Sequence, residues 1–217
     1  MYIKICCISS EKEAQLAIDY GADAIGLVGP MPNGPGIITN DQIQKIAKMA
    51  SSKVDTFLLT SETSVKGIIE HYKKVKTNTI QLVDELQEGS YEELTEALPN
   101  VKLVQVIHVF EQAMINHALR ISEKVDALLL DSGNPNAKIK TLGGTGETHN
   151  WDWSKEICKQ SKIPVYLAGG LDANNVQNAI QKVNPSGVDL CSGVRSNGLL
   201  DEDKLKAYMM TVRDLND

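Results

Sequence analysis

The chain has 217 residues, of which 42% are hydrophobic and 23% are charged, and these values are typical of a globular protein with one sizeable core. Its formal net charge of −6 and its lack of any basic stripe argue against a nucleic-acid partner. No apolar run approaches the ~20 residues that a membrane-spanning helix needs, and the first residues lack a signal-peptide pattern, so we expect a cytoplasmic protein without membrane contact.

Segments typical of strands and helices alternate along the whole chain. Thr39 and Gln42 have the spacing of a capping box before the second helix, and Gly21 is placed to end the first. In chain order the expected strand and helix pairs are Tyr2–Ile8 and Glu11–Tyr20, Ala24–Val28 and Asp41–Ala50, Lys53–Leu59 and Ser64–Tyr72, Thr79–Val83 and Ser90–Leu98, Val101–Val109 and Glu111–Ser122, Ala127–Asp131 and Trp153–Gln160, Val165–Ala168 and Asn174–Val183, and Gly187–Cys191 and Asp201–Asp214.

This alternation predicts a parallel sheet with helical crossovers. An open doubly wound sheet is disfavoured because the first turn, Cys7–Ser10, lacks the Gly-x-Gly-x-x-Gly pattern of dinucleotide-binding folds. We therefore expect residues 1–217 to form a single (β/α)8 TIM barrel with parallel strands, slightly shorter than the usual ~250 residues. The longest connections, Gly29–Ile38 and Ser132–Trp151, would lie at its carboxyl-terminal face, where active sites of such barrels are built.

The first strand places a thiol at this face. Side chains alternate along a strand, so apolar Ile3 and Ile5 should face the helices while Lys4 and Cys6 point into the barrel. Cys7 should then point away from the barrel, toward the helix layer or into the strand–loop turn. Cys6 is a candidate proton-abstracting base, although a free cysteine can equally be a buried filler. Lys4 should be a buried cation in contact with Asp189 of the neighbouring last strand.

The four cysteines, Cys6, Cys7, Cys158 and Cys191, show no Cys-x-x-Cys spacing. Neither a disulfide nor a zinc site is therefore expected.

Asp131 ends the otherwise wholly apolar strand that begins at Ala127. A carboxyl group there is either a hydrogen-bond acceptor for the following loop or a catalytic acid that apolar surroundings keep protonated.

Glycine-rich loops follow the last three strands. Loops after the seventh and eighth strands of such barrels commonly hold a phosphate with backbone N–H groups, and small residues let the backbone approach the anion. The alternative is that they are only tight turns. The candidate phosphate-binding residues are Gly144, Gly169, Gly170, Ser192 and Gly193.

At these residues the chain resembles the phosphoribosylanthranilate isomerase family over nearly its whole length. The segments that carry the resemblance are Lys4–Cys6, Gly21–Gly26, Ile80–Leu82, Leu128–Asp131, Gly143–Gly146 with Trp151–Trp153, Leu167–Leu171 with Asn174–Val176, and Gly187–Asp189 with Ser192–Val194. The resemblance implies a (β/α)8 barrel that catalyses an Amadori rearrangement of a phosphorylated small molecule in tryptophan biosynthesis. It implies no metal or organic cofactor, and a monomer or homodimer. It assigns Asp131 as the general acid that opens the ribose ring and Cys6 as the base that removes the C2 proton, with Gln81 in the substrate pocket.

The chain departs from the family pattern at the end that recognises anthranilate. Gly36 stands where the family carries an arginine that binds the anthranilate carboxylate, Val83 replaces a histidine, and Cys7 replaces a glycine. Arg195 replaces a glutamate in the last loop. It could supply a substitute cation to the pocket, serve another anionic substrate, or pair with Asp201 or Glu202 on the surface.

Three functions remain open. The first is phosphoribosylanthranilate isomerisation, the second is isomerisation of another sugar phosphate by a paralogue, and the third is non-catalytic binding of a phosphorylated ligand.

Overall fold

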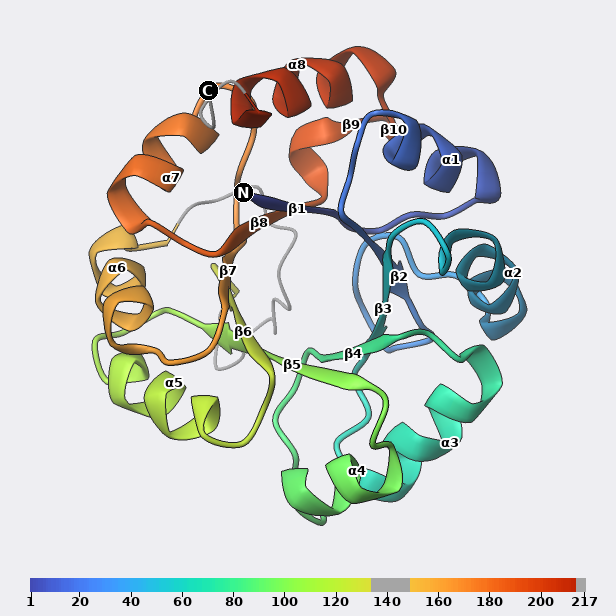
Figure 1. The fold of residues 1–217 in the computed structure, drawn as a ribbon, viewed down its shortest axis with the longest axis vertical. Helices are drawn as coiled ribbons and strands as arrows, with labels where there is room; N and C mark the ends of the chain where they lie inside the picture. Colours follow the sequence, from blue (N-terminus) through green and yellow to red (C-terminus); the bar gives the residue numbers. More distant parts are fainter. Residues whose placement is uncertain (134–148, 214–217) are drawn as a thin grey trace.

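A computed structural model of the chain describes residues 1–133 and 149–213. Eight parallel strands form a closed barrel in which each strand pairs with the next and β8 pairs with β1. Figure 1 looks along this barrel and shows the helices in a ring around it. The strands are β1 (Tyr2–Ile5), β2 (Ala24–Val28), β3 (Asp55–Thr60), β4 (Thr79–Leu82), β5 (Lys102–His108), β6 (Ala127–Asp131), β7 (Val165–Leu167) and β8 (Gly187–Leu190). The predicted (β/α)8 fold is confirmed.

Each strand is followed by a helix, and most of these helices begin at a side-chain cap. Ser10, Ser64 and Ser90 each accept a hydrogen bond from the first turn of their helix, and Thr39 forms the predicted capping box with Gln42. The helices are α1 (Glu11–Asp19), α2 (Asn40–Ala50), α3 (Val65–Val75), α4 (Tyr91–Ala97), α5 (Met114–Ser122), α6 (Trp151–Gln160), α7 (Val176–Val183) and α8 (Glu202–Arg213). None of the described helices is both long and apolar enough to cross a membrane.

The apolar side chains form two layers, as alternation along the strands requires. Ile3 and Ile5 belong to the larger layer between the strands and the helices, which confirms their expected orientation. The smaller layer fills the barrel interior and includes Cys6, Phe57 and Leu129.

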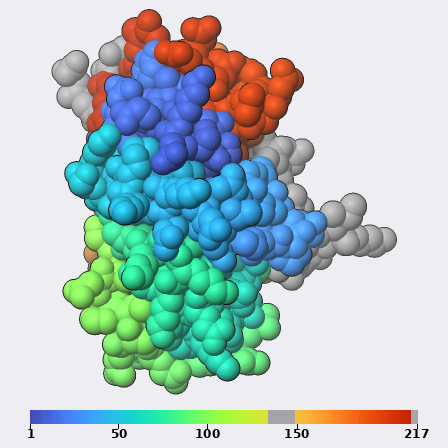
Figure 2. Space-filling view, turned by 90° about the vertical axis from the view of Figure 1, so that its right-hand side faces the viewer, coloured from blue at the N-terminus to red at the C-terminus, as the bar shows by residue number. Residues whose placement is uncertain are grey.

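Two elements between β8 and α8 were not predicted. Ser192–Val194 form a short 3-10 helix, and Arg195–Ser196 (β9) pair with Leu199–Leu200 (β10) in a two-stranded hairpin. In Figure 1 the hairpin lies beside α1. The loop between β2 and α2 also stands out from the body of the molecule, as the blue surface of Figure 2 shows.

Candidate active site

A cavity opens at the carboxyl ends of the strands, where the sequence predicts an active site. Its lining includes the candidate acid and base, two of the candidate phosphate-binding glycines and an apolar wall. The described residues that line it are Cys6, Cys7, Val28, Met31, Gly34, Pro35, Leu59, Gln81, Val83, Val106, Asp131, Ala168, Gly169, Gly170, Leu171, Asp189, Leu190, Cys191 and Ser192.

Cys6 follows β1 and points into the barrel as predicted. Its sulfur has room because β2 carries Gly26 opposite, where an added Cβ would lie 2.8 Å from Cys6 Sγ and 3.1 Å from Lys4 Nζ. Lys4 Nζ forms the predicted ion pair with Asp189 at 2.8 Å and lies over the Phe57 ring. Lys4 is almost fully buried and is not among the described residues that line the cavity, whereas its partner Asp189 is.

Cys7 does not point away from the barrel, so that prediction is wrong. β1 ends at Ile5, and Cys7 has a φ of +62°, which breaks the alternation on which the prediction rested. Its side chain consequently joins the interior layer and lines the cavity beside Cys6 and Cys191. A hydrogen bond with Cys191 raises the pKa of the Cys7 thiol, and the same bond lowers the pKa of Cys191.

Asp131 ends β6 and is partly exposed at the cavity wall, where its Oδ1 accepts a hydrogen bond from the Ser132 N–H at 2.7 Å. Gln81, near the end of β4, is almost fully buried and also lines the cavity. Its side-chain oxygen has no hydrogen-bond partner among the described residues. Because an unsatisfied buried acceptor is costly, Gln81 is suited to receive a hydrogen bond from a ligand.

The loops after β7 and β8 pack closely together at one side of the cavity, where Gly169, Gly170 and Ser192 form a concave rim, the glycine cup. Gly169 and Gly170 have φ values of +84° and +63°, a conformation that favours glycine, and both line the cavity. Gly193 was also expected at the cavity, but it is not among the described residues that line it. An added Cβ at Gly193 would lie 2.0 Å from the Leu171 carbonyl oxygen, so the lack of a side chain there lets the loops after β7 and β8 approach each other. Ser192 lines the cavity as predicted, whereas Gly144 lies outside the described residues.

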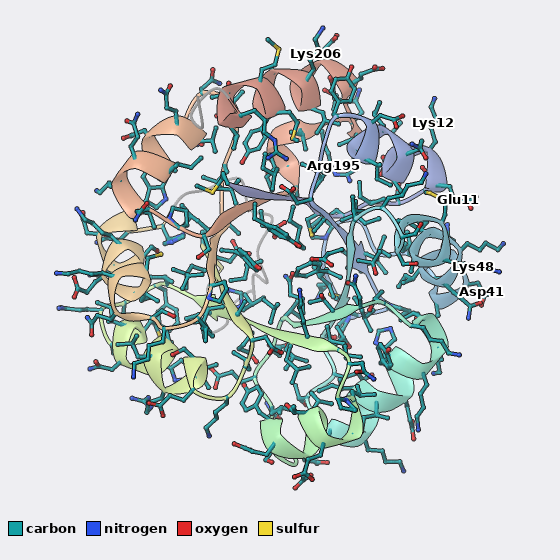
Figure 3. All side chains as sticks on the ribbon, in the orientation of Figure 1. Glu11, Lys12, Asp41, Lys48, Arg195 and Lys206 are labelled. Atoms are coloured by element: carbon teal, nitrogen blue, oxygen red, sulfur yellow. The ribbon has the colours of Figure 1, made fainter. Side chains whose placement is uncertain are left out.

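Arg195 is not a cation of the pocket. Its guanidinium lies 3.3 Å from Glu13 Oε1, and it donates hydrogen bonds to the backbone carbonyls of Cys6, Cys7 and Gly198. Figure 3 shows Arg195 between α8 and α1, outward from the barrel axis. The expected alternatives of a pocket cation or a pair with Asp201 or Glu202 are therefore wrong. Glu13, on the facing helix, was not considered.

The sequence reasoning also missed most of the apolar wall. The apolar wall includes Val83 and four further side chains that come from β2 to β5 or from the loops after them. These four are Val28, Met31, Leu59 and Val106. Their strands were predicted, but the residue at which each strand ends decides which side chain faces the cavity, and single-sequence patterns place such ends only to within a few residues.

Comparison with known proteins identifies the family. The family model for N-(5'phosphoribosyl)anthranilate (PRA) isomerase matches residues 3–211. N-(5'-phosphoribosyl)anthranilate isomerase 2 of Methanosarcina mazei is 37% identical over 94% of this chain and 91% of its own length. N-(5'-phosphoribosyl)anthranilate isomerase of Methanosarcina acetivorans is 32% identical over 97% of this chain and 92% of its own length. A crystal structure of phosphoribosyl anthranilate isomerase from Thermotoga maritima has a TM-score of 0.82 at 25% identity and covers 99% of both chains.

Proposed function

The chain belongs to the N-(5'-phosphoribosyl)anthranilate isomerase family, and its relatives are named as isomerases of that compound. On that premise we propose that it catalyses an Amadori rearrangement, which is an aldose–ketose isomerisation. Cys6 acts as the general base and Asp131 as the general acid. The observation that supports these roles is that the two side chains come from different strands and line the same cavity. The substrate named by the relatives is N-(5-phosphoribosyl)anthranilate, an intermediate of tryptophan biosynthesis.

The two groups suffice for the proton transfers that such a rearrangement requires. Asp131 gives a proton to the ribose ring oxygen, so the ring opens to a protonated imine. Cys6 then removes the proton from C2, the electron pair moves toward the imine nitrogen, and an enolamine forms. Tautomerisation returns a proton to C1 and yields the ketone. No net oxidation occurs, so the step needs only positioned acids and bases.

The glycine cup is suited to the phosphate end of the substrate. Among the described residues, no backbone group accepts a hydrogen bond from the N–H of Gly169 or Gly170, and the Gly170 carbonyl is held by the Asn175 side chain at 2.7 Å. Backbone N–H groups of such loops therefore remain for an anion. Ser192 adds a hydroxyl group at the same rim.

Cys6 is a better candidate for the base than its neighbour Cys7. Hydrogen bonding to Cys191 raises the pKa of Cys7, which keeps that thiol protonated near neutral pH. Cys191 is the third thiol at the rim, and its lowered pKa makes it the competing candidate. Substitution of each cysteine separately distinguishes the three.

The test is turnover of N-(5-phosphoribosyl)anthranilate by matched variants. Cys6→Ala and Asp131→Asn should each lower kcat by at least about 100-fold, because each removes a general acid or base. Cys158→Ala, on α6 and outside the cavity lining, controls for the loss of a thiol. Circular dichroism and urea unfolding should show that the variants remain folded. Near-normal kcat in Cys6→Ala, or a larger loss in Cys191→Ala, would show that the base is misassigned.

A further inference from the structure

We propose that Cys7 and Cys191 form a reversible disulfide on reaction with a peroxide, and that this bond switches off chemistry at the neighbouring Cys6. All four cysteines of the chain are free in the structure, so the bond belongs to an oxidised form of the protein. Three of them, Cys6, Cys7 and Cys191, line one cavity. The sequence spacing that argues against a structural disulfide does not bear on a transient, redox-sensing one.

The ends of β1 and β8 bring the two thiols together. The strands pair in parallel as far as Ile5 and Leu190, and the Cys6 N–H extends the ladder with a 2.8 Å hydrogen bond to the Leu190 carbonyl. Just beyond this bond, the thiols of Cys7 and Cys191 are joined by a hydrogen bond. Neighbouring strands lie about 4.8 Å apart, within the Cα separation of roughly 4.4–6.8 Å that a disulfide spans. A bond between these two sulfurs therefore needs little movement of the backbone.

The backbone of Cys7 is fixed on the cavity side. Its φ is +62°, and it lies so close to Gly36 that an added Cβ there would be 2.6 Å from the Cys7 Cβ. Arg195 donates hydrogen bonds to the carbonyls of Cys6 and Cys7. Joining Cys7 to Cys191 consequently costs little conformational entropy. A bond between Cys6 and Cys7 would instead close a small ring that strains the peptide bond between them.

Cys191 has the surroundings of a reactive thiol. The hydrogen bond from Cys7 lowers the pKa of Cys191 and the nearby Arg195 charge lowers it further, and together they outweigh burial, which raises it. Cys191 is also partly exposed and lines the cavity, through which a small oxidant reaches it. Thiolates of this kind, with a second thiol beside them, are the ones that peroxides oxidise. Burial raises the pKa of Cys158 on α6 to about 12, so that cysteine should react slowly.

The reaction balances with hydrogen peroxide as the oxidant. The Cys191 thiolate attacks one peroxide oxygen, the O–O bond breaks, and the leaving hydroxide takes up a proton to give water. The Cys7 sulfur then attacks the sulfenic acid at Cys191, so that the S–S bond forms, the S–O bond breaks, and the Cys7 proton leaves with the oxygen as a second water. The two thiols lose two electrons and the peroxide gains them. A dithiol reverses the reaction by exchange.

The bond would act on the segment that carries Cys6. It ties the residues after β1 to the end of β8 and places two linked sulfurs beside the Cys6 thiol in the same cavity. Formation of the disulfide goes beyond isomerisation and does not depend on it. The loss of turnover that we expect to follow rests on the proposed function, in which Cys6 is the base.

The first test treats the reduced full-length chain with a small excess of hydrogen peroxide and counts free thiols after denaturation. The count should fall from four to two, and peptide mapping should link Cys7 to Cys191. Dithiothreitol should restore all four thiols. Cys158→Ala should form the same bond, whereas Cys7→Ser and Cys191→Ser should form none. A full thiol count after oxidation, or a disulfide that includes Cys6, Cys158 or a second chain, would overturn the inference.

The second test separates the bond from the isomerase reaction. Cys6→Ala should still form the Cys7–Cys191 bond, because Cys6 takes no part in it. In the parent chain, turnover of N-(5-phosphoribosyl)anthranilate should fall at least about ten-fold on oxidation and return with dithiothreitol, because the base is obstructed. Cys191→Ser lacks the attacking thiolate and should keep most of the activity of its own reduced form, with circular dichroism confirming that it is folded.

An equal loss in oxidised Cys191→Ser would show that the peroxide acts on another group, and it would overturn the switch. A reduced parent chain without turnover would refute the proposed function, while the thiol count would still decide the disulfide.

Discussion

At the scale of single residues, Arg195 shows how a side chain that looks functional in sequence can be structural. Glu13 receives hydrogen bonds from the Ser9 and Leu200 N–H groups as well as the Arg195 guanidinium. Burial works against its ionised form, yet these hydrogen bonds and the nearby charge hold the pKa of Glu13 below its usual range. The network joins β10 to α1 and fixes the carbonyl groups of Cys6 and Cys7.

We expect Arg195→Met to lower the free energy of unfolding by about 3 kcal/mol, since it leaves Glu13 buried without its cation. The KM for N-(5-phosphoribosyl)anthranilate should change little, because Arg195 does not line the cavity. Urea unfolding and steady-state kinetics measure the two quantities. Arg195→Lys is the conservative control. A variant that keeps its stability but loses turnover of N-(5-phosphoribosyl)anthranilate would show that Arg195 acts on the substrate and not on stability.

Cys7 shows where the direction of a side chain can no longer be predicted from alternation along a strand. Alternation along β1 correctly oriented Ile3, Ile5 and Cys6, because the Cys6 N–H still donates a hydrogen bond to the Leu190 carbonyl of β8 and pleating dictates the direction of each side chain in such a ladder. Beyond the last paired residue the pleat no longer applies. Cys7 has a positive φ and lies close to Gly36 of the loop after β2, and no local pattern encodes this approach.

At the scale of elements, the capping residues and apolar spacing were enough to find all eight strands and eight helices. β2 and β6 have the predicted bounds, and the remaining elements differ from their predicted bounds by one to three residues at one or both ends. The β9–β10 hairpin was missed because two-residue strands carry no periodicity. It is held instead by tertiary contacts such as the Leu200 N–H to Glu13 hydrogen bond.

A buried histidine joins three of these elements. His71 on α3 contacts Thr60 of β3 through Nδ1 at 2.9 Å and Asn40 of α2 through Nε2 at 3.0 Å. Gly29 makes room for it, since a Cβ there would lie 2.4 Å from the imidazole. Burial lowers the pKa of His71 from its ordinary value of 6.5. The folded state therefore binds this proton less readily than the unfolded state does.

We accordingly expect stability to fall as the pH is lowered below 6.5, by up to about 1.4 kcal/mol per pH unit from this group. Burial also lowers the pKa of His149, to about 4, so it adds to the same trend. Urea unfolding between pH 7.5 and 5 measures the slope, which should be shallower in His71→Gln. His117→Gln, at the exposed pair with Glu85, controls for loss of a titratable ring. An unchanged slope in His71→Gln would contradict this account.

At the scale of the whole molecule, regular alternation predicted a closed barrel because eight equal β–α units leave no edge strand to protect. Closure itself occurs between β1 and β8, where Tyr2 to Ile5 pair with Gly187 to Leu190 in register. This register places Lys4 opposite Asp189, as the sequence predicted. The cavity at the end of the barrel was predictable in position, whereas its charge balance required the structure, because it depends on which cations are engaged elsewhere.

The Lys4–Asp189 pair should therefore contribute to closing the barrel. Burial by itself lowers the pKa of Lys4, but the adjacent Asp189 carboxylate raises it, so Lys4 keeps its charge. Burial raises the pKa of Asp189, and the Lys4 charge opposes that rise. Lys4→Met leaves the Asp189 carboxylate buried without a cation, and we expect it to lower the free energy of unfolding by roughly 3–5 kcal/mol. Asp189→Leu should cost a similar amount, whereas the double variant should recover most of the loss, since two apolar side chains then face each other. A double-mutant cycle in urea measures this coupling. Losses that simply add would show that the two strands close without help from this pair.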